Sequence, residues 1–120
     1  MNSLEKDFAP YKESLELKEI GFDEPCIRGW DKSGKIWYHP DSDIITDNPT
    51  FSQAFRWFRE KYGYIAEINN YSTSDGYSFS FKILLKKYTP FINANNAWCN
   101  YEAAELECLR KLIEIVKSKK

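Results

Sequence analysis

The sequence predicts a two-layer α+β domain in which helices cover one face of an antiparallel sheet of about four strands. Two patterns lead to this fold class. In three segments the apolar residues recur every three or four positions, as they do along one face of a helix. Between these segments lie two pairs of strand-like runs, each pair separated by a polar loop typical of a β-hairpin. The expected order of elements is therefore αββαββα.

The first helix and the first hairpin occupy the N-terminal third of the chain. We expect the helix to begin near Pro10, because proline is tolerated in a first turn, and to end at Ile20. Gly21 follows as the helix stop. The two strands of the hairpin are Cys26–Trp30 and Lys35–His39, and the polar loop between them ends in glycine.

The second helix is expected over Pro49–Tyr62. Two starts fit the sequence: Asn48 as cap with proline at the first helical position, or a capping box formed by Thr50 and Gln53. Gly63 ends the helix. One face of this helix is strongly aromatic and consists of Phe51, Ala54, Phe55, Phe58 and Tyr62.

The second hairpin and the last helix complete the predicted fold. The strands are Tyr64–Tyr71 and Tyr77–Leu85, and the second alternates between large apolar and polar residues, which predicts one covered face. The last helix is expected over Tyr101–Val116 with Asn100 as its cap. Leu106 and Ile115 widen its apolar arc, so it is either buried on two sides or part of a homodimer seam.

The length of 120 residues predicts one domain over residues 1–120, with a frayed start at residues 1–9 and a tail at residues 117–120. No apolar run is long enough for a signal peptide or a membrane span. The three cysteines, Cys26, Cys99 and Cys108, show no CxxC spacing. These features predict a cytoplasmic protein with free thiols and no membrane partner.

With a net charge of −1, the chain has no overall excess of basic residues of the kind that nucleic-acid-binding proteins usually show. The glycine-rich motifs that bind nucleotide phosphates, GxxxxGK[ST] and GxGxxG, do not occur, so no cofactor is predicted. One acidic loop contains the only histidine, with candidate metal ligands His39, Asp41, Asp43 and Asp47. It lacks the glycine and terminal glutamate of a calcium loop. A solvated turn that caps the next helix is the favoured interpretation, with a metal site as the alternative.

Cysteine chemistry offers a second candidate for catalysis. A thiol nucleophile needs a base within hydrogen-bond reach, and Cys26 and His39 could share the first hairpin. Cys99 precedes a helix cap, and a helix N-terminus lowers the pKa of a thiol. Cys108 lies on the apolar stripe of the last helix and is best explained as a core residue. Structural cysteines are favoured, so the sequence indicates no catalytic residue and leans away from an enzyme.

The strongest binding candidates lie together on the second helix: Trp57, Arg56, Arg59 and Lys61. Basic and aromatic residues that alternate in this way could bind an acidic partner or stack on bases. The favoured interpretation is an amphipathic helix whose aromatic residues belong to the core and whose charges face water, with Trp57 as the exception. Trp57 lies about 120° from the centre of the apolar stripe at 100° per residue, so it covers a neighbouring loop or anchors a partner.

Three segments, residues 21–26, 51–62 and 101–113, carry a resemblance to a family. Together they resemble small uncharacterised proteins of gut Bacteroidetes, their bacteriophages and mobile elements, and the resemblance extends from about Leu15 onward. It implies a cytoplasmic accessory protein encoded by a phage or prophage, and it assigns no activity, ligand or catalytic residue.

The sequence therefore favours a non-enzymatic module that binds a protein partner or itself. The alternative is a nucleic-acid-binding protein that uses the Arg56–Lys61 edge or the face of the sheet. A small thiol or hydrolytic enzyme is the third hypothesis.

Overall fold

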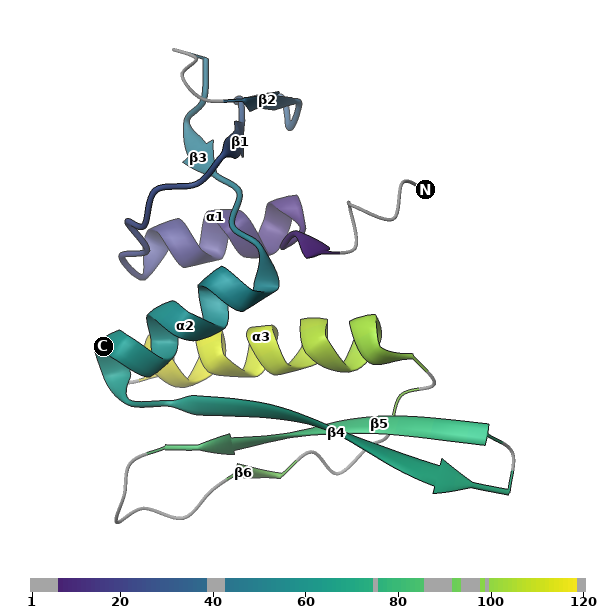
Figure 1. Ribbon diagram of the computed structural model, residues 1–120. Coiled ribbons are helices and arrows are strands. Elements are labelled where there is room, and N and C mark those ends of the chain that lie inside the picture. The colour runs from purple at the N-terminus through teal and green to yellow at the C-terminus, as the bar shows by residue number, and fades with distance from the viewer. Residues whose placement is uncertain are drawn as a thin grey trace.

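The computed structural model describes residues 7–38, 43–74, 76–85, 92–93, 98 and 100–118. Figure 1 shows the order of its helices and strands, which confirms the α+β class. The elements are α1 (Tyr11–Glu19), β1 (Arg28–Trp30), β2 (Ile36–Tyr38), β3 (Thr46–Asp47), α2 (Phe51–Tyr62), β4 (Ile65–Thr73), β5 (Gly76–Leu84), β6 (Ile92–Asn93) and α3 (Tyr101–Ser118).

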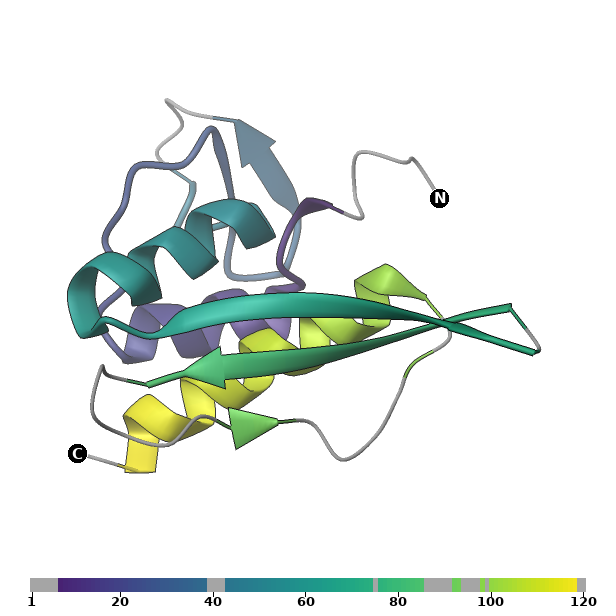
Figure 2. The ribbon, with the colours of Figure 1, turned by 60° about the horizontal axis from the view of Figure 1, so that its bottom comes forward.

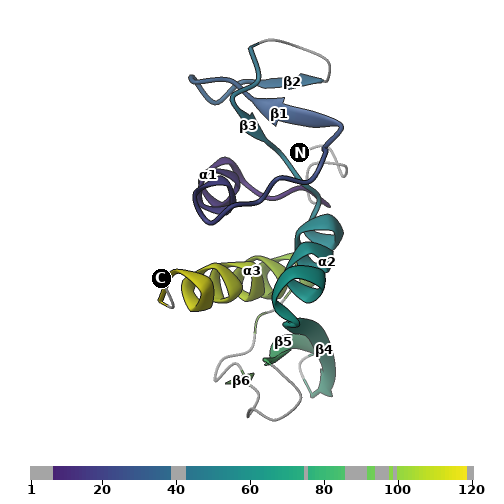
Figure 3. The same cartoon turned by 90° about the vertical axis from the view of Figure 1, so that its left-hand side faces the viewer.

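The expected single sheet of about four strands is wrong, because the strands form two sheets of three. Their orders are β2-β1-β3 and β4-β5-β6, so each predicted hairpin gains one short strand and the two hairpins do not pair with each other. The helices lie between the two sheets and hold them apart (Figures 1 and 3). The sequence signals a hairpin locally, but which hairpins share a sheet depends on where the helices pack.

The close approach of β3 to β1 depends on Gly29. This residue lies opposite Asp47 in the antiparallel pair. A Cβ at this position would lie 2.4 Å from a methyl group of Ile44 and 2.7 Å from the carbonyl oxygen of Thr46. Because such contacts are shorter than van der Waals distance, the third strand can join the small sheet only when this residue is glycine.

The main core lies where α2 and α3 pack on the sheet formed by β4 and β5. Apolar side chains with no exposed surface come from four elements, namely Leu17, Ala54, Phe58, Ile83, Ala104, Cys108, Leu109 and Leu112. Each large apolar side chain buried in this way contributes about 1.5–3 kcal/mol. Ile115 is also buried and Leu106 packs partly against the core. The wide apolar arc of α3 therefore reflects burial on two sides within the chain.

The ends of α2 follow the predicted signals, and the structure decides between the two expected starts. Thr50 is the cap, since its hydroxyl oxygen accepts a hydrogen bond of 3.1 Å from the amide of Gln53. Gly63 ends the helix with a left-handed φ of 75°. Asn48 instead has no exposed surface. Its side-chain oxygen accepts a hydrogen bond of 2.7 Å from Nε of the buried Arg28.

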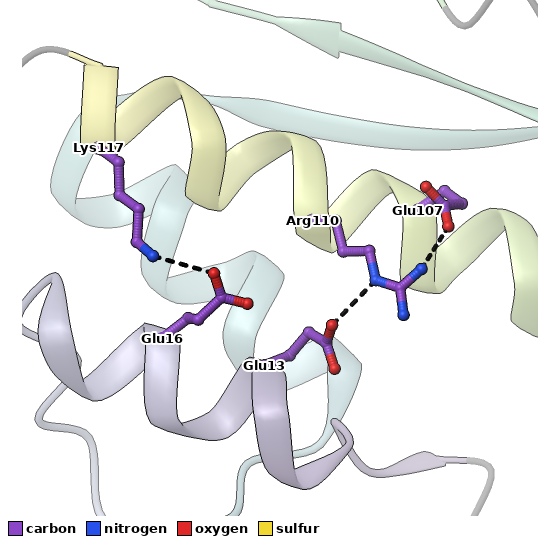
Figure 4. Close-up of polar contacts among 5 residues, drawn as sticks. All are labelled: Glu13, Glu16, Glu107, Arg110 and Lys117. Carbon is purple, nitrogen blue, oxygen red and sulfur yellow. Dashed lines mark hydrogen bonds and ion pairs between the residues drawn. The ribbon is translucent and has the colours of Figure 1, made fainter.

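Ion pairs join α1 to α3 (Figure 4). Nε of Arg110 donates to Glu13 at 2.9 Å, and the side chain of Glu13 is only 1% exposed. Arg110 also contacts Glu107 on its own helix. Lys117, near the end of α3, forms a second ion pair with α1, because its Nζ lies 2.9 Å from Glu16. Glu13 is thus a buried carboxylate that Arg110 neutralises from the neighbouring helix.

Of the expected frayed start and tail, only residues 7–9 and 117–118 lie within the described part of the chain. Phe8 is buried and forms an isolated antiparallel bridge with Thr50. The amide of Ala9 donates to the carbonyl of Pro49 at 2.9 Å. At the other end, α3 continues to Ser118, so residues 117 and 118 are helical. These contacts hold the residues before α1 against the start of α2.

Candidate functional site: a basic groove between α2 and β4

An open groove of about 570 Å³ lies between the outer face of α2 and the first part of β4. Helix α2 supplies polar and basic side chains, β4 supplies Ala66, and Phe55 provides an aromatic wall. Figure 2 shows α2 above the first half of β4, which is the outermost strand of its sheet among the described residues. The polar residues that line the groove are Ser52, Gln53, Arg56 and Arg59, with Thr50 at the start of the helix.

Helical spacing explains why α2 presents these residues together. Residues three, four and seven positions apart lie on the same side of an α-helix. The opposite side carries Ala54 and Phe58, which are fully buried and hold the helix against the core. The aromatic core face therefore directs Ser52, Arg56 and Arg59 outward into the groove.

The two arginines are only weakly neutralised. Nε of Arg56 lies 3.7 Å from Glu60, with side-chain exposures of 52% and 60%. An exposed pair at i and i+4 contributes only a few tenths of a kcal/mol, so this pair can open readily. Arg59 is exposed, and no residue in the described part of the chain forms a salt bridge with it. The groove therefore offers two guanidinium groups to an anionic ligand.

The structure separates the four predicted binding residues into two groups. Arg56 and Arg59 line the groove, whereas Trp57 is 4% exposed and belongs to the core. Its ring packs edge to face on Phe22 at a centroid distance of 5.4 Å. Trp57 therefore covers the turn after α1 and is not available as a surface anchor. Nζ of Lys61 lies 5.1 Å from the centre of that same ring, on the side of α2 away from the groove.

The thiols that the structure describes are poor nucleophiles. Burial raises the pKa of Cys26 to about 12, and the charges of Asp47 and Glu24 add to this effect. Burial likewise raises the pKa of Cys108 to about 12, with a smaller contribution from Glu105. Both thiols are therefore protonated at neutral pH. The core assignment of Cys108 is confirmed, because its side chain is fully buried in α3.

The other catalytic and metal candidates are only partly within the described residues. Cys99, His39 and Asp41 lie outside them, so the dyad of Cys26 with His39 stays a prediction. Asp43 and Asp47 are described. Among the residues that the structure describes, no three His, Cys, Asp or Glu side chains come close enough to hold a metal ion.

Comparison with known proteins finds no matching family model, no match among curated proteins and no matching solved structure. Within the described ranges, no helix has the length and apolar character needed to cross a membrane.

Sequence reasoning identified the two arginines but not the surface to which they belong. The outward stripe of Ser52, Gln53, Arg56 and Arg59 can be recognised from helical spacing alone. The contribution of Ala66 cannot be recognised in this way, because nothing local indicates that β4 runs beside α2 at the edge of the described sheet. That arrangement is a product of the tertiary fold.

Proposed function

We propose that this chain is a non-enzymatic binding module whose groove between α2 and β4 holds an acidic segment of a protein partner. The observation that supports this most is the pair of exposed arginines, Arg56 and Arg59, one helical turn apart in one groove. A guanidinium group binds a carboxylate through two parallel hydrogen bonds, so two arginines in one groove suit a segment with acidic side chains.

The shape of the groove favours a segment of protein chain over a small molecule. Sites for small molecules are concave and bury most of the ligand. This groove is open to solvent, and it has one aromatic wall, Phe55, beside polar side chains. Such a surface provides apolar contact for the stem of a side chain and ionic contact for its end.

The two alternative functions have less support. Nucleic-acid binding at the Arg56–Lys61 edge would need a continuous basic strip, but Lys61 lies over Trp57 on the other side of the helix. On the sheet face the exposed Glu67 lies opposite Lys82 in the pairing of β4 with β5, so the described residues give this face no excess of basic charge for phosphate. A thiol enzyme would need a reactive cysteine, and burial raises the pKa of Cys26 to about 12.

A selection from displayed random 16-residue peptides tests the proposal. We expect the wild-type protein to enrich acidic sequences and the double variant Arg56→Glu with Arg59→Glu to lose them, because the groove then repels carboxylates. The matched control is Lys12→Glu with Lys32→Glu, since both lysines are exposed and lie outside the groove.

The control changes the net charge by the same amount and should enrich the same peptides as the wild type. Circular dichroism and thermal melting verify that all three proteins are folded. Enrichment of the same sequences by the groove variant would remove the groove as the binding site. A lack of enrichment by the wild-type protein would contradict the binding function.

A further inference from the structure

Strand β4 has a free edge beside the groove. It pairs with β5 over its whole length, from Ile65 opposite Leu84 to Thr73 opposite Gly76. On its other side no strand is present among the residues that the structure describes. An unpaired edge of nine residues offers a row of backbone donors and acceptors to another chain.

The hydrogen bonds on the far side of β5 reveal which groups of β4 point outward. The amide of Phe79 donates to the carbonyl of Trp98 at 2.8 Å, and the amide of Trp98 donates back at 2.7 Å. Phe79 therefore directs both backbone groups away from its partner Asn70 on β4. In antiparallel pairing this means that Asn70 directs its own N–H and C=O towards the free edge. Ala66 and Ile68 do the same, because the direction alternates along a strand.

The same alternation places the side chains of β4. Ala66 and Ile68 pack partly against the core, on the side of the helices. Ile65 and Glu67 are exposed on the opposite face. A strand added at this edge would therefore direct every second side chain towards α2, where Arg56 and Arg59 line the groove.

The spacing of the arginines matches such a strand. Side chains on one face of an extended strand recur about every 6.6 Å, which is two rises of about 3.3 Å. Residues three apart on a helix have Cβ atoms about 5–6 Å apart. Two acidic side chains at alternate positions of an added strand can therefore meet Arg56 and Arg59 at the same time.

We infer that the partner segment binds as an extended strand on the free edge of β4, with acidic residues at alternate positions facing Arg56 and Arg59. This inference rests on the proposed function and specifies how the groove is used. Backbone hydrogen bonds from Ala66, Ile68 and Asn70 provide affinity, and the arginines select for charge. Strand addition of this kind is a common mode of peptide recognition.

A second copy of this chain is a less suitable occupant. By alternation along the strand, the side chains of β4 on the helix side are those of Ala66, Ile68 and Asn70, whereas Glu67 lies on the opposite face. A second β4 strand added at this edge would therefore present no carboxylate to Arg56 and Arg59. An acidic peptide neutralises the same groups.

The test uses the full chain and an end-capped peptide, (Glu-Thr)5, in which every glutamate lies on one face of an extended strand. Amide hydrogen exchange is measured with and without saturating peptide. We expect exchange at Ala66, Ile68 and Asn70 to slow by about tenfold or more, because each amide gains a hydrogen bond that must open before exchange. Amides of Glu67 and Asn69 already point to β5 and should change little.

Two control peptides and two variants sharpen this test. The analogue (Lys-Thr)5 should not bind, and a peptide of the same length with glutamate at every third position should bind more weakly, because successive glutamates then lie on opposite faces of an extended strand. Asn70→Pro removes the backbone N–H that faces the free edge but breaks no hydrogen bond to β5, so this variant should bind the peptide more weakly. Asn70→Ala keeps that N–H and should bind as well as the wild type. Thermal melting confirms that both variants fold.

The outcomes separate the inference from the proposed function. Binding that depends on Arg56 and Arg59 but leaves exchange unchanged at the three alternate amides would overturn strand addition and leave the binding module standing. Equal binding of (Lys-Thr)5 would overturn the acidic pattern. Protection of the same amides at high protein concentration without peptide would show a second copy as the occupant and also overturn the inference. If neither (Glu-Thr)5 nor any displayed peptide binds, the proposed function fails as well.

Discussion

Replacing Trp57 by alanine should destabilise the protein by about 3–5 kcal/mol, the usual cost of deleting a buried tryptophan ring. The ring is 4% exposed. It packs edge to face on Phe22 at 5.4 Å and on Phe58 at 5.0 Å, so its loss leaves a cavity between α2 and the turn after α1. Proteins of this size are stable by about 5–15 kcal/mol, so the variant should remain folded or become marginal.

The measurement is urea unfolding followed by far-ultraviolet circular dichroism, which reports helix content and not the missing indole. Arg59→Ala is the matched control, because it lies two positions away on the same helix and its side chain is exposed. The control should change the free energy of unfolding by less than about 0.5 kcal/mol. A loss below about 1 kcal/mol for Trp57→Ala would refute the placement of this ring in the core.

Two further predictions concern the buried carboxylate of Glu13 and the half-buried carboxyl of Glu105. Arg110→Met should cost about 2 kcal/mol in urea unfolding, less than the 3–5 kcal/mol of a fully buried pair, because Arg110 is 44% exposed. Lys111→Met, which loses only an exposed pair, should cost almost nothing, and equal losses would contradict the role of Glu13. Burial, aided by Asp7 and Glu102, raises the pKa of Glu105 from 4.5 to about 7. The folded state therefore binds the proton of this carboxyl more tightly than the unfolded state does. The protonated carboxyl contributes its full stabilisation below pH 4.5, and this contribution is lost as the pH rises through 7. Glu105→Gln should therefore match the wild type at pH 4 and exceed it by about 1 kcal/mol at pH 8, after allowance for solvent at the half-buried carboxyl. An equal difference at both pH values would exclude this linkage.

The helices could be predicted well because their signals are local. The apolar stripe of α3 places Cys108, Leu109 and Leu112 on one face, and all three are fully buried. Gly63 ends α2 in the left-handed conformation that its position suggests. Capping and helical spacing depend on residues within one or two turns of each other, so a single sequence contains them.

The position of Trp57 shows where local reasoning stops. Its angle on the helix placed it off the apolar stripe. That position was compatible with two roles, covering a neighbouring loop or anchoring a partner. Phe22, which belongs to another segment of the chain, covers the ring in the structure. Helical periodicity describes one element at a time and contains no information about what packs against its flank.

By itself the sequence determined the α+β class, the three helices and the outward arginines of α2, since each follows from residue spacing within one segment. Only the tertiary structure decided that the hairpins form two separate sheets, that Trp57 belongs to the core and that β4 is an edge strand beside Arg56 and Arg59. The physical reason is that sheet neighbours and groove walls come from contacts between segments distant in the chain. Such contacts depend on an arrangement that buries the apolar faces of α1, α2 and α3 at the same time.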